Sequence, residues 1–293
     1  MGNRLLTLFG LCAAGMFISS LIGYGLAVWL FDIELSQLAD HENYRSLQGM
    51  KLSQALITIG TFLVPALILA RVYKQKISEF FLTKSIRFDL LVITTLLAFA
   101  AIPVIAWMAE LNSQMIFPES LSWLEEIIRS AEDNAMVLTE ALLNVTTYPE
   151  LAINVVVIAV LPALGEEFLF RGALQQTLIK SGKNRHAAIW ITAIIFSAIH
   201  FQFYGFLPRM VLGALFGYLM VWGGSIWYSV WAHFINNATS VYIMFLINRK
   251  EVEGDLETFG ANSGDWFYAI LGVVVVLASL GFFRFITLQK QAE

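Results

Sequence analysis

The stretch LPALGEEFLFRGALQQTL, residues 161–178, places three ionisable side chains inside apolar sequence. They are Glu166, Glu167 and Arg171, and apolar residues flank them on both sides. An acidic or basic residue at the centre of a membrane helix costs about 2.5–3.5 kcal/mol on insertion scales, so such residues need a partner or a function. The stretch therefore raises two questions: whether it spans a membrane, and what its charges do.

The composition of the whole chain answers the first question. Of its 293 residues, 58% are hydrophobic and 14% are charged, and the mean hydropathy is +0.71. Soluble domains have about 45–50% apolar and 25% charged residues, and a soluble fold of this length cannot bury so much apolar surface. No basic run indicates nucleic acid, and one cysteine, Cys12, excludes an internal disulfide. We predict an all-α, polytopic transmembrane helix bundle in a lipid bilayer.

Eight apolar segments approach the length of a membrane helix, which needs about 20 residues. The first is longer than the apolar core of a cleavable signal peptide, which has about 7–15 residues, so we expect it to be a span. The segments form one membrane domain, residues 1–293. The expected spans are residues 5–31, 53–72, 89–109, 149–176, 187–203, 207–223, 226–247 and 266–287.

The basic residues between the spans predict the orientation. With a cytoplasmic N-terminus, most of them fall on the cytoplasmic side, which is the bias that the positive-inside rule describes. We therefore expect both termini to be cytoplasmic. The inner set is Arg4, Arg71, Lys74, Lys76, Lys84, Arg87, Lys180, Lys183, Arg185, Arg284 and Lys290, and the outer set is Arg45, Lys51, Arg129, Arg209, Arg249 and Lys250.

Two segments outside the spans mix apolar and charged residues. Residues 74–88 suit a short amphipathic helix on the cytoplasmic leaflet, and residues 119–146 suit a helix on the outer surface. Each is equally well interpreted as a solvated connector with some apolar contact. The sequence gives no role for the long outer segment 110–148.

Helix geometry separates the three charges of the opening stretch. Glu167 and Arg171 are four residues apart and can pair on one helix face. Glu166 points about 100° away from Glu167, so this pair leaves it free. If residues 181–184 form the turn of a helical hairpin centred on Lys183, Glu166 precedes the centre by 17 residues and His200 follows it by 17. At about 1.5 Å per residue, the carboxylate and the imidazole lie at one height.

A further polar group lies in the seventh apolar segment. His233 and Asn237 are four residues apart and share a face, and Asn236 is the neighbouring candidate. Each polar residue taken singly has a structural interpretation, as an interhelical hydrogen-bonding group. A free glutamate, two histidines and an asparagine on three spans indicate a polar interior, and ionisable residues inside a membrane are functional candidates.

Two kinds of chemistry suit these residues. Glu166 could act as a general base that activates water, with His200 orienting that water and with His233 and Asn237 donating to the developing oxyanion. Such an assembly hydrolyses an amide. Alternatively, Glu166, His200 and His233 are three ligands for a catalytic zinc with an open fourth position. The HExxH pattern of one large class of zinc peptidases is absent from the sequence.

Three short motifs occur in order on successive apolar stretches. They are EEFLFR (E-E-x-x-x-R) at 166–171, FSAIH (F-x-x-x-H) at 196–200 and HFINN (H-x-x-x-N) at 233–237. Together they resemble the CPBP family, which comprises the CAAX prenyl endopeptidases of the second type and the bacteriocin-processing and immunity (Abi) proteins. The resemblance covers residues 149–247.

The resemblance implies an intramembrane peptidase within an eight-helix bundle. The residues it implies are Glu166, Glu167, Arg171, His200, His233 and Asn237. Glu166 is then the base, supported by Glu167 and Arg171. His200 assists with water or metal, and His233 with Asn237 stabilises the oxyanion or binds metal. The family is often labelled metalloprotease, although a metal-free glutamate mechanism is also argued for it. We favour the glutamate mechanism, with zinc as the alternative cofactor.

The expected activity is hydrolysis of a membrane-anchored or amphipathic peptide in a bacterial cytoplasmic membrane. The first alternative is a non-proteolytic immunity or scaffold protein, in which the same residues serve packing and assembly. The second is a transporter, for which the symmetric broken-helix repeats are missing from the sequence.

Overall fold

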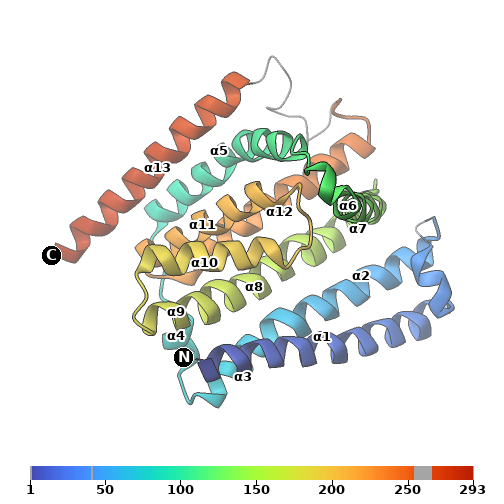
Figure 1. The fold of residues 1–293 in the computed structure, drawn as a ribbon, viewed down its shortest axis with the longest axis horizontal. Coiled ribbons are helices and arrows are strands. Elements are labelled where there is room, and N and C mark those ends of the chain that lie inside the picture. The colour runs from blue at the N-terminus through green and yellow to red at the C-terminus, as the bar shows by residue number, and fades with distance from the viewer. Residues whose placement is uncertain (1, 41, 254–265, 293) are drawn as a thin grey trace.

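Long helices lie roughly alongside one another in the computed structural model, which describes residues 2–40, 42–253 and 266–292. These residues form helices and connecting turns, with no strand among them. The helix α1 begins and α13 ends toward the same end of the bundle (Figure 1). The predicted all-α bundle is confirmed, and which end faces the cytoplasm stays a prediction.

Seven helices among the described residues are long and apolar enough to cross a membrane. Two of them contain short π-helical segments, and the second of these carries the opening stretch. The seven are α1 (Gly2–Phe31); α2 (Tyr44–Thr58) with η2 (Ile59–Leu63) and α3 (Val64–Val72); α5 (Phe88–Ser113); the continuous segment Tyr148–Lys180; α11 (Phe206–Gly223); α12 (Ile226–Asn248); and α13 (Trp266–Ala292).

The fifth expected span, residues 187–203, is shorter than predicted. Helix α10 (Arg185–Ala198) has only 14 residues. It ends where Phe201 takes a positive φ of 52° and where the Ser197 hydroxyl donates to the Phe206 carbonyl at the start of α11 (2.7 Å). His200 therefore lies on a loop. Irregular backbone at membrane depth is tolerated where protein buries it or where it lines a polar cavity.

Short turns precede α10 and separate α11 from α12. The turn expected at residues 181–184 is present, with Gly182 at φ 89° and with Asn184 capping α10 by accepting from the His186 amide. Gly224 adopts a left-handed conformation (φ 68°) between α11 and α12. Both positive φ values suit glycine, which lacks the Cβ that makes them costly. These turns join the continuous segment Tyr148–Lys180 to α10, and α11 to α12.

The expected amphipathic helix at residues 74–88 is wrong for most of that segment. Its helix, α4 (Ile77–Phe80), has four residues, and Phe80 and Phe81 are buried in the protein core rather than on a lipid surface. Ser225 donates to the Lys84 carbonyl (2.8 Å). The charged residues of the segment remain outside while its aromatic residues anchor it, so the connector interpretation is the better one.

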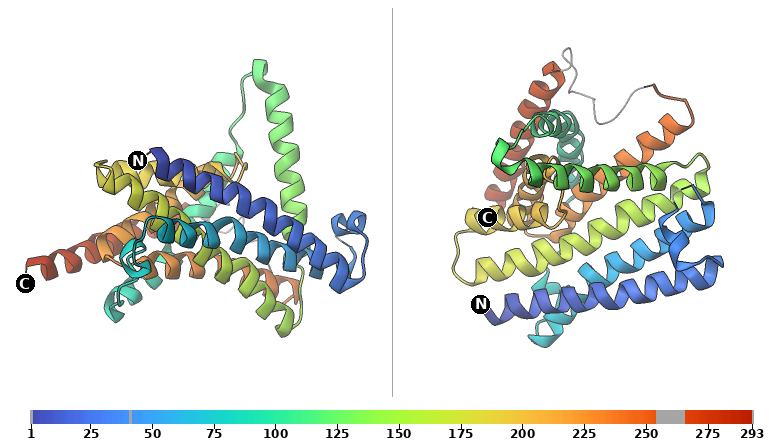
Figure 2. Two further views of the ribbon diagram at one scale, coloured as in Figure 1. Left: turned by 90° about the horizontal axis from the view of Figure 1, so that it is seen from below. Right: turned by 45° about the vertical axis from the view of Figure 1, so that its right-hand side comes forward.

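The expected helix within residues 119–146 is present as α6 (Ser122–Leu143), preceded by the short turn η3 (Glu119–Leu121). It projects from the bundle at a steep angle to the spans (Figure 2). Trp123, Ile127 and Val137 are among its exposed apolar side chains. Another short helix, η1 (Leu35–Ala39), connects α1 to α2.

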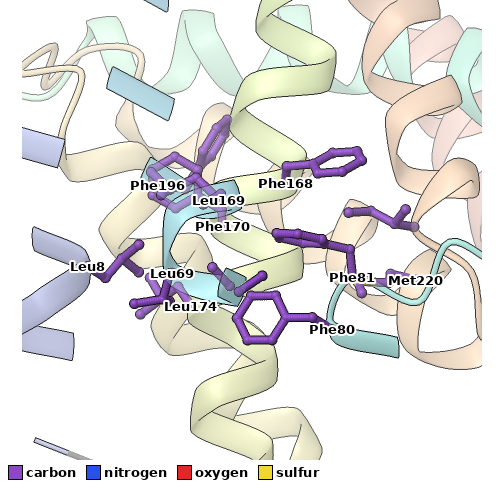
Figure 3. Close-up of a cluster of buried hydrophobic side chains, with 14 of the residues drawn as sticks. Leu8, Leu69, Phe80, Phe81, Phe168, Leu169, Phe170, Leu174, Phe196 and Met220 are labelled. Atoms are coloured by element: carbon purple, nitrogen blue, oxygen red, sulfur yellow. The ribbon is translucent and has the colours of Figure 1, made fainter. Parts of the chain in front are cut away.

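One hydrophobic cluster surrounds the helix that carries the opening stretch. It joins Leu8 of α1, Leu69 of α3, Phe80 of α4, and Phe168 and Phe170 of the central helix (Figure 3). The rings of Phe81 and Phe168 lie 4.9 Å apart. Between membrane helices, such side chains stabilise the bundle through van der Waals packing rather than through removal from water. This packing surrounds the central helix and thereby positions its charges.

Candidate functional site

The central helix is continuous but not uniform. It runs through α7 (Tyr148–Asn154), η4 (Val155–Val160), α8 (Leu161–Glu167), η5 (Phe168–Gln175) and α9 (Gln176–Lys180), and η4 and η5 are π-helical. A Thr147–Glu150 capping box starts it. The two glutamates end α8, between the two π segments. π-Helical turns are rare and occur frequently at functional sites, so the backbone itself marks this position.

Glu167 and Arg171 form the ion pair that their spacing predicts. Glu167 Oε1 accepts from Arg171 Nη1 at 2.6 Å, and both side chains are fully buried. Arg171 Nη2 also donates to the Gly213 carbonyl at 2.9 Å, and its guanidinium lies over the ring of Phe196, 4.6 Å from the centroid. A buried pair is tolerated when further hydrogen bonds satisfy its charges. The Gly213 carbonyl and the aromatic face do this for part of the guanidinium, while Arg171 Nε and Glu167 Oε2 have no hydrogen-bond partner among the described residues.

Glu167 has a second partner that the sequence did not predict. Its Oε1 lies 2.9 Å from Nδ1 of His233 on α12. A carboxylate paired with an arginine is ionised and can only accept, so Nδ1 carries the proton. In the neutral ring, Nε2 is then an acceptor, and it lies 3.9 Å from Glu166 Oε2. Arg171, Glu167, His233 and Glu166 therefore form one chain of polar contacts.

His200 reaches the same region from the loop after α10. Its Nδ1 lies 2.8 Å from the Phe196 carbonyl. A carbonyl only accepts, so Nδ1 donates and Nε2 keeps a lone pair. The ring of Phe196 lies edge-on to both His200 and His233. Glu166 and His200 each interact electrostatically with His233, and the single height that the hairpin count expects for them stays a prediction.

Asn237 lies one turn beyond His233 and contacts the central helix. Its Nδ2 donates to the Ile158 carbonyl at 3.1 Å, and its Oδ1 accepts from Asn236 at 3.2 Å. The Ile158 carbonyl is open to this bond because Pro162, four residues on, has no N–H to donate. The orientation of the Asn237 amide is thus fixed by a proline on the neighbouring helix.

Arg209 is a charged residue near the candidate site that the sequence analysis missed, because it was counted among the outer basic residues. It is half-buried in the first turn of α11 and donates to Gln202 Oε1 at 2.6 Å. It interacts electrostatically with Glu166 and His200. The signal in the sequence was its position after Pro208, inside an expected span.

The predicted metal ligands are not gathered as a metal site. Among the residues that the structure describes, no group of three or more His, Cys, Asp or Glu side chains is placed to hold a metal ion. The Nδ1 bonds of His233 to Glu167 and of His200 to Phe196 leave Nε2 as the free nitrogen of both rings. Metal-bound histidines are oriented in the same way, so these bonds do not decide against zinc. The chemistry below is derived for the glutamate mechanism, with zinc as the alternative.

Comparison with known proteins agrees with the geometry. Residues 148–239, which hold all the motif residues, match the family of type II CAAX prenyl endopeptidases described as Rce1-like. This match supports membership of the CPBP family, as the three motifs predicted.

Among curated proteins, the chain is 30% identical over 89 residues to the "Uncharacterized protein YpbD" of Bacillus subtilis (strain 168). The match covers 29% of this chain and 42% of the relative, so it spans less than half of that protein's length. No solved structure shows significant similarity.

Proposed function

We propose that the protein is an intramembrane endopeptidase that hydrolyses a peptide bond in a membrane-anchored or amphipathic substrate. The observation that carries the proposal is the buried approach of Glu166 Oε2 to His233 Nε2, 3.9 Å apart. The family match, a peptidase family, supports the same reaction class. A bacterial cytoplasmic membrane is the proposed location, and the Bacillus relative is in keeping with it.

Glu166 is the proposed general base. A water molecule at hydrogen-bonding distance from both Glu166 Oε2 and His233 Nε2, about 2.8 Å from each, fits their 3.9 Å separation. Both atoms accept, so such a water directs one proton to each and a lone pair outward. Glu166 removes a proton as the water oxygen attacks the carbonyl carbon, and then returns it to the leaving nitrogen as the C–N bond breaks.

The other residues take supporting roles. Glu167 holds His233 in one tautomer, as Arg171 holds Glu167. In the neutral ring Nε2 has no proton to donate, so we assign His233 to the water rather than to the oxyanion. Asn237 has two amide N–H groups and gives one to Ile158, which leaves the other for the oxyanion. His200 Nε2 is a further acceptor for water or for the substrate amide.

The test is cleavage of a library of membrane-anchored and amphipathic peptides by purified wild type and by Glu166→Gln. The variant is nearly isosteric and removes the base, so we expect cleavage to fall at least about 100-fold, within the range for a positioned acid–base group. Glu126→Gln, an exposed change on α6, is the control and should cleave like wild type. Full cleavage by Glu166→Gln would contradict the role of Glu166 as the base, and a wild type that cleaves no peptide would favour the non-proteolytic alternative.

The zinc alternative is tested on the same samples. A glutamate mechanism predicts that cleavage survives prolonged incubation with a strong chelator and that metal analysis of active protein finds less than one equivalent of zinc. Loss of cleavage with the chelator and its return with zinc would contradict the proposed mechanism.

A further inference from the structure

The loop that carries His200 is held from outside the bundle core. Residues 199–205 are non-helical between α10 and α11, so their backbone groups need partners beyond a helix. The outer segment supplies them. Glu132 Oε1 of α6 accepts from the Tyr204 amide at 2.9 Å, and the Gly205 amide also faces this carboxylate.

The Tyr204 side chain is held by the same helix. Its hydroxyl donates to Glu125 Oε1 at 3.3 Å, and the Arg129 guanidinium lies over its ring, 4.3 Å from the centroid. Arg129 also donates to Glu125 at 2.8 Å. This hydrogen bond with Arg129 lowers the pKa of the Glu125 carboxyl, so both groups stay charged near neutral pH. Glu125, Arg129 and Glu132, on successive turns of α6, therefore all contact Tyr204 of the loop.

The outer segment makes two more contacts, one with a residue before Tyr204 and one with a residue after it. The ring of Phe117, before α6, lies 4.8 Å from the ring of Phe203. Asn112, buried at the end of α5, accepts from the Leu207 amide through Oδ1 at 2.8 Å. The outer segment thus contacts the chain from Phe203 to Leu207, directly between His200 and Arg209.

We propose that Glu132 is a positioning residue for the candidate site: by holding the Tyr204 amide, it sets the places of His200 and Arg209 beside Glu166. The inference rests on the proposed function and gives the outer segment a role. Burial raises the pKa of the Glu132 carboxyl, and this carboxyl also interacts electrostatically with Arg209. Glu132 therefore contacts this region in two ways: it accepts a hydrogen bond from the Tyr204 amide, and its charge interacts with Arg209.

The test compares Glu132→Ala, Glu132→Gln and a control, Glu140→Ala, on the full chain. Glu140 is an exposed glutamate two turns further along α6. We expect Glu132→Ala to lower kcat about 10-fold to 100-fold, as a misplaced catalytic group does, with KM within about twofold. Glu132→Gln keeps an acceptor oxygen and should recover part of kcat. Glu140→Ala should match wild type.

A second readout is independent of cleavage. The chain has four histidines, so nitrogen NMR of histidine-labelled protein in micelles can follow His200, assigned with His200→Gln. Glu132→Ala should shift its ring-nitrogen signals, and Glu140→Ala should not. If His200 signals and kcat are both unchanged in Glu132→Ala, the inference is wrong. If wild type cleaves no peptide, the proposed function fails, and the His200 signals alone decide whether Glu132 positions the loop.

Discussion

Adjacent glutamates have different environments in this protein. Glu167 is fully buried and shared between Arg171 and His233. Glu166, one residue earlier, is free of the arginine hydrogen bonds and faces His233 Nε2 from 3.9 Å. A charge that is tied into a buried pair contributes to the fold, and one left near an open acceptor is available for chemistry. The two positions should therefore respond differently to the same substitution.

We expect Glu167→Gln to destabilise the protein strongly and Glu166→Gln to leave stability nearly unchanged. Breaking a buried ion pair by removing one partner costs about 3–5 kcal/mol, because the remaining charge is uncompensated. Unfolding in detergent micelles, followed by circular dichroism during denaturant titration, gives both values. Equal stability losses in the two variants would contradict the division of roles.

Of the two contacts of Glu167, sequence spacing predicted only the one within its own helix. The Glu167–Arg171 pair follows from two residues four apart on one helix. The Glu167–His233 bond joins α8 to α12, 66 residues apart, and depends on helix packing that spacing does not encode. The same limit hid Arg209, whose partners come from the loop before it and from the central helix.

The close approach of two helices holds Arg171 in place. A Cβ at Gly213 of α11 would lie 3.1 Å from the Phe196 ring and 3.2 Å from Arg171 Nη2. Gln175, one turn on from Arg171, similarly donates to the carbonyl of Gly217 (3.4 Å). Glycine at these two positions lets backbone carbonyls of α11 meet side chains of the central helix.

Gly213→Ala should destabilise the protein by about 1–3 kcal/mol, the usual range for overpacking, and should lower cleavage by displacing Arg171. Gly281→Ala in α13 is the matched control, since a Cβ there meets open space. Alanine is the better helix former by about 0.5–1 kcal/mol, so this control should be neutral or slightly stabilising. Denaturant titration of both variants checks the difference, and a stable Gly213→Ala would contradict the tight contact.

The bounds of a helix could be predicted from the sequence where the length of an apolar segment alone determines them. The expected spans 226–247 and 207–223 agree with α12 and α11 to within a residue. The span at 187–203 failed because Ile199, Phe201 and Phe203 are apolar yet lie in a loop, whose Tyr204 amide is bound by Glu132 of α6. Residues 74–88 failed because their aromatic residues pack into the core, which an amphipathic pattern cannot distinguish from lipid contact.

The whole bundle has an asymmetric outline. The turn at residues 181–184 lies near the end where α1 begins, and α6 projects at the opposite end (Figure 1, Figure 2). Exposed apolar residues such as Trp123 and Ile127 lie on α6 among acidic ones. A helix with such a face suits the membrane–water boundary, in this case on the outer side if the positive-inside prediction holds.

We expect the α6 end to face outward. In a Cys12→Ala background, Asp133→Cys should react with a membrane-impermeant maleimide in intact spheroplasts, and Lys183→Cys should react only after lysis. Both positions are exposed in the structure. Gel-shift detection of the labelled chain gives the result. The reverse pattern would invert the proposed topology.

The π segments η4 and η5 have a consequence for comparing this chain with its relatives. A π turn encloses one more residue than an α turn, through its i→i+5 hydrogen bond. The flanks of such a segment keep their rotational phase when that additional residue is lost. Relatives that differ in length here should therefore align with one-residue gaps inside residues 155–160 or 168–175, in mid-helix, where gaps are ordinarily penalised. An alignment that moves those gaps into the loops would shift the glutamates out of register.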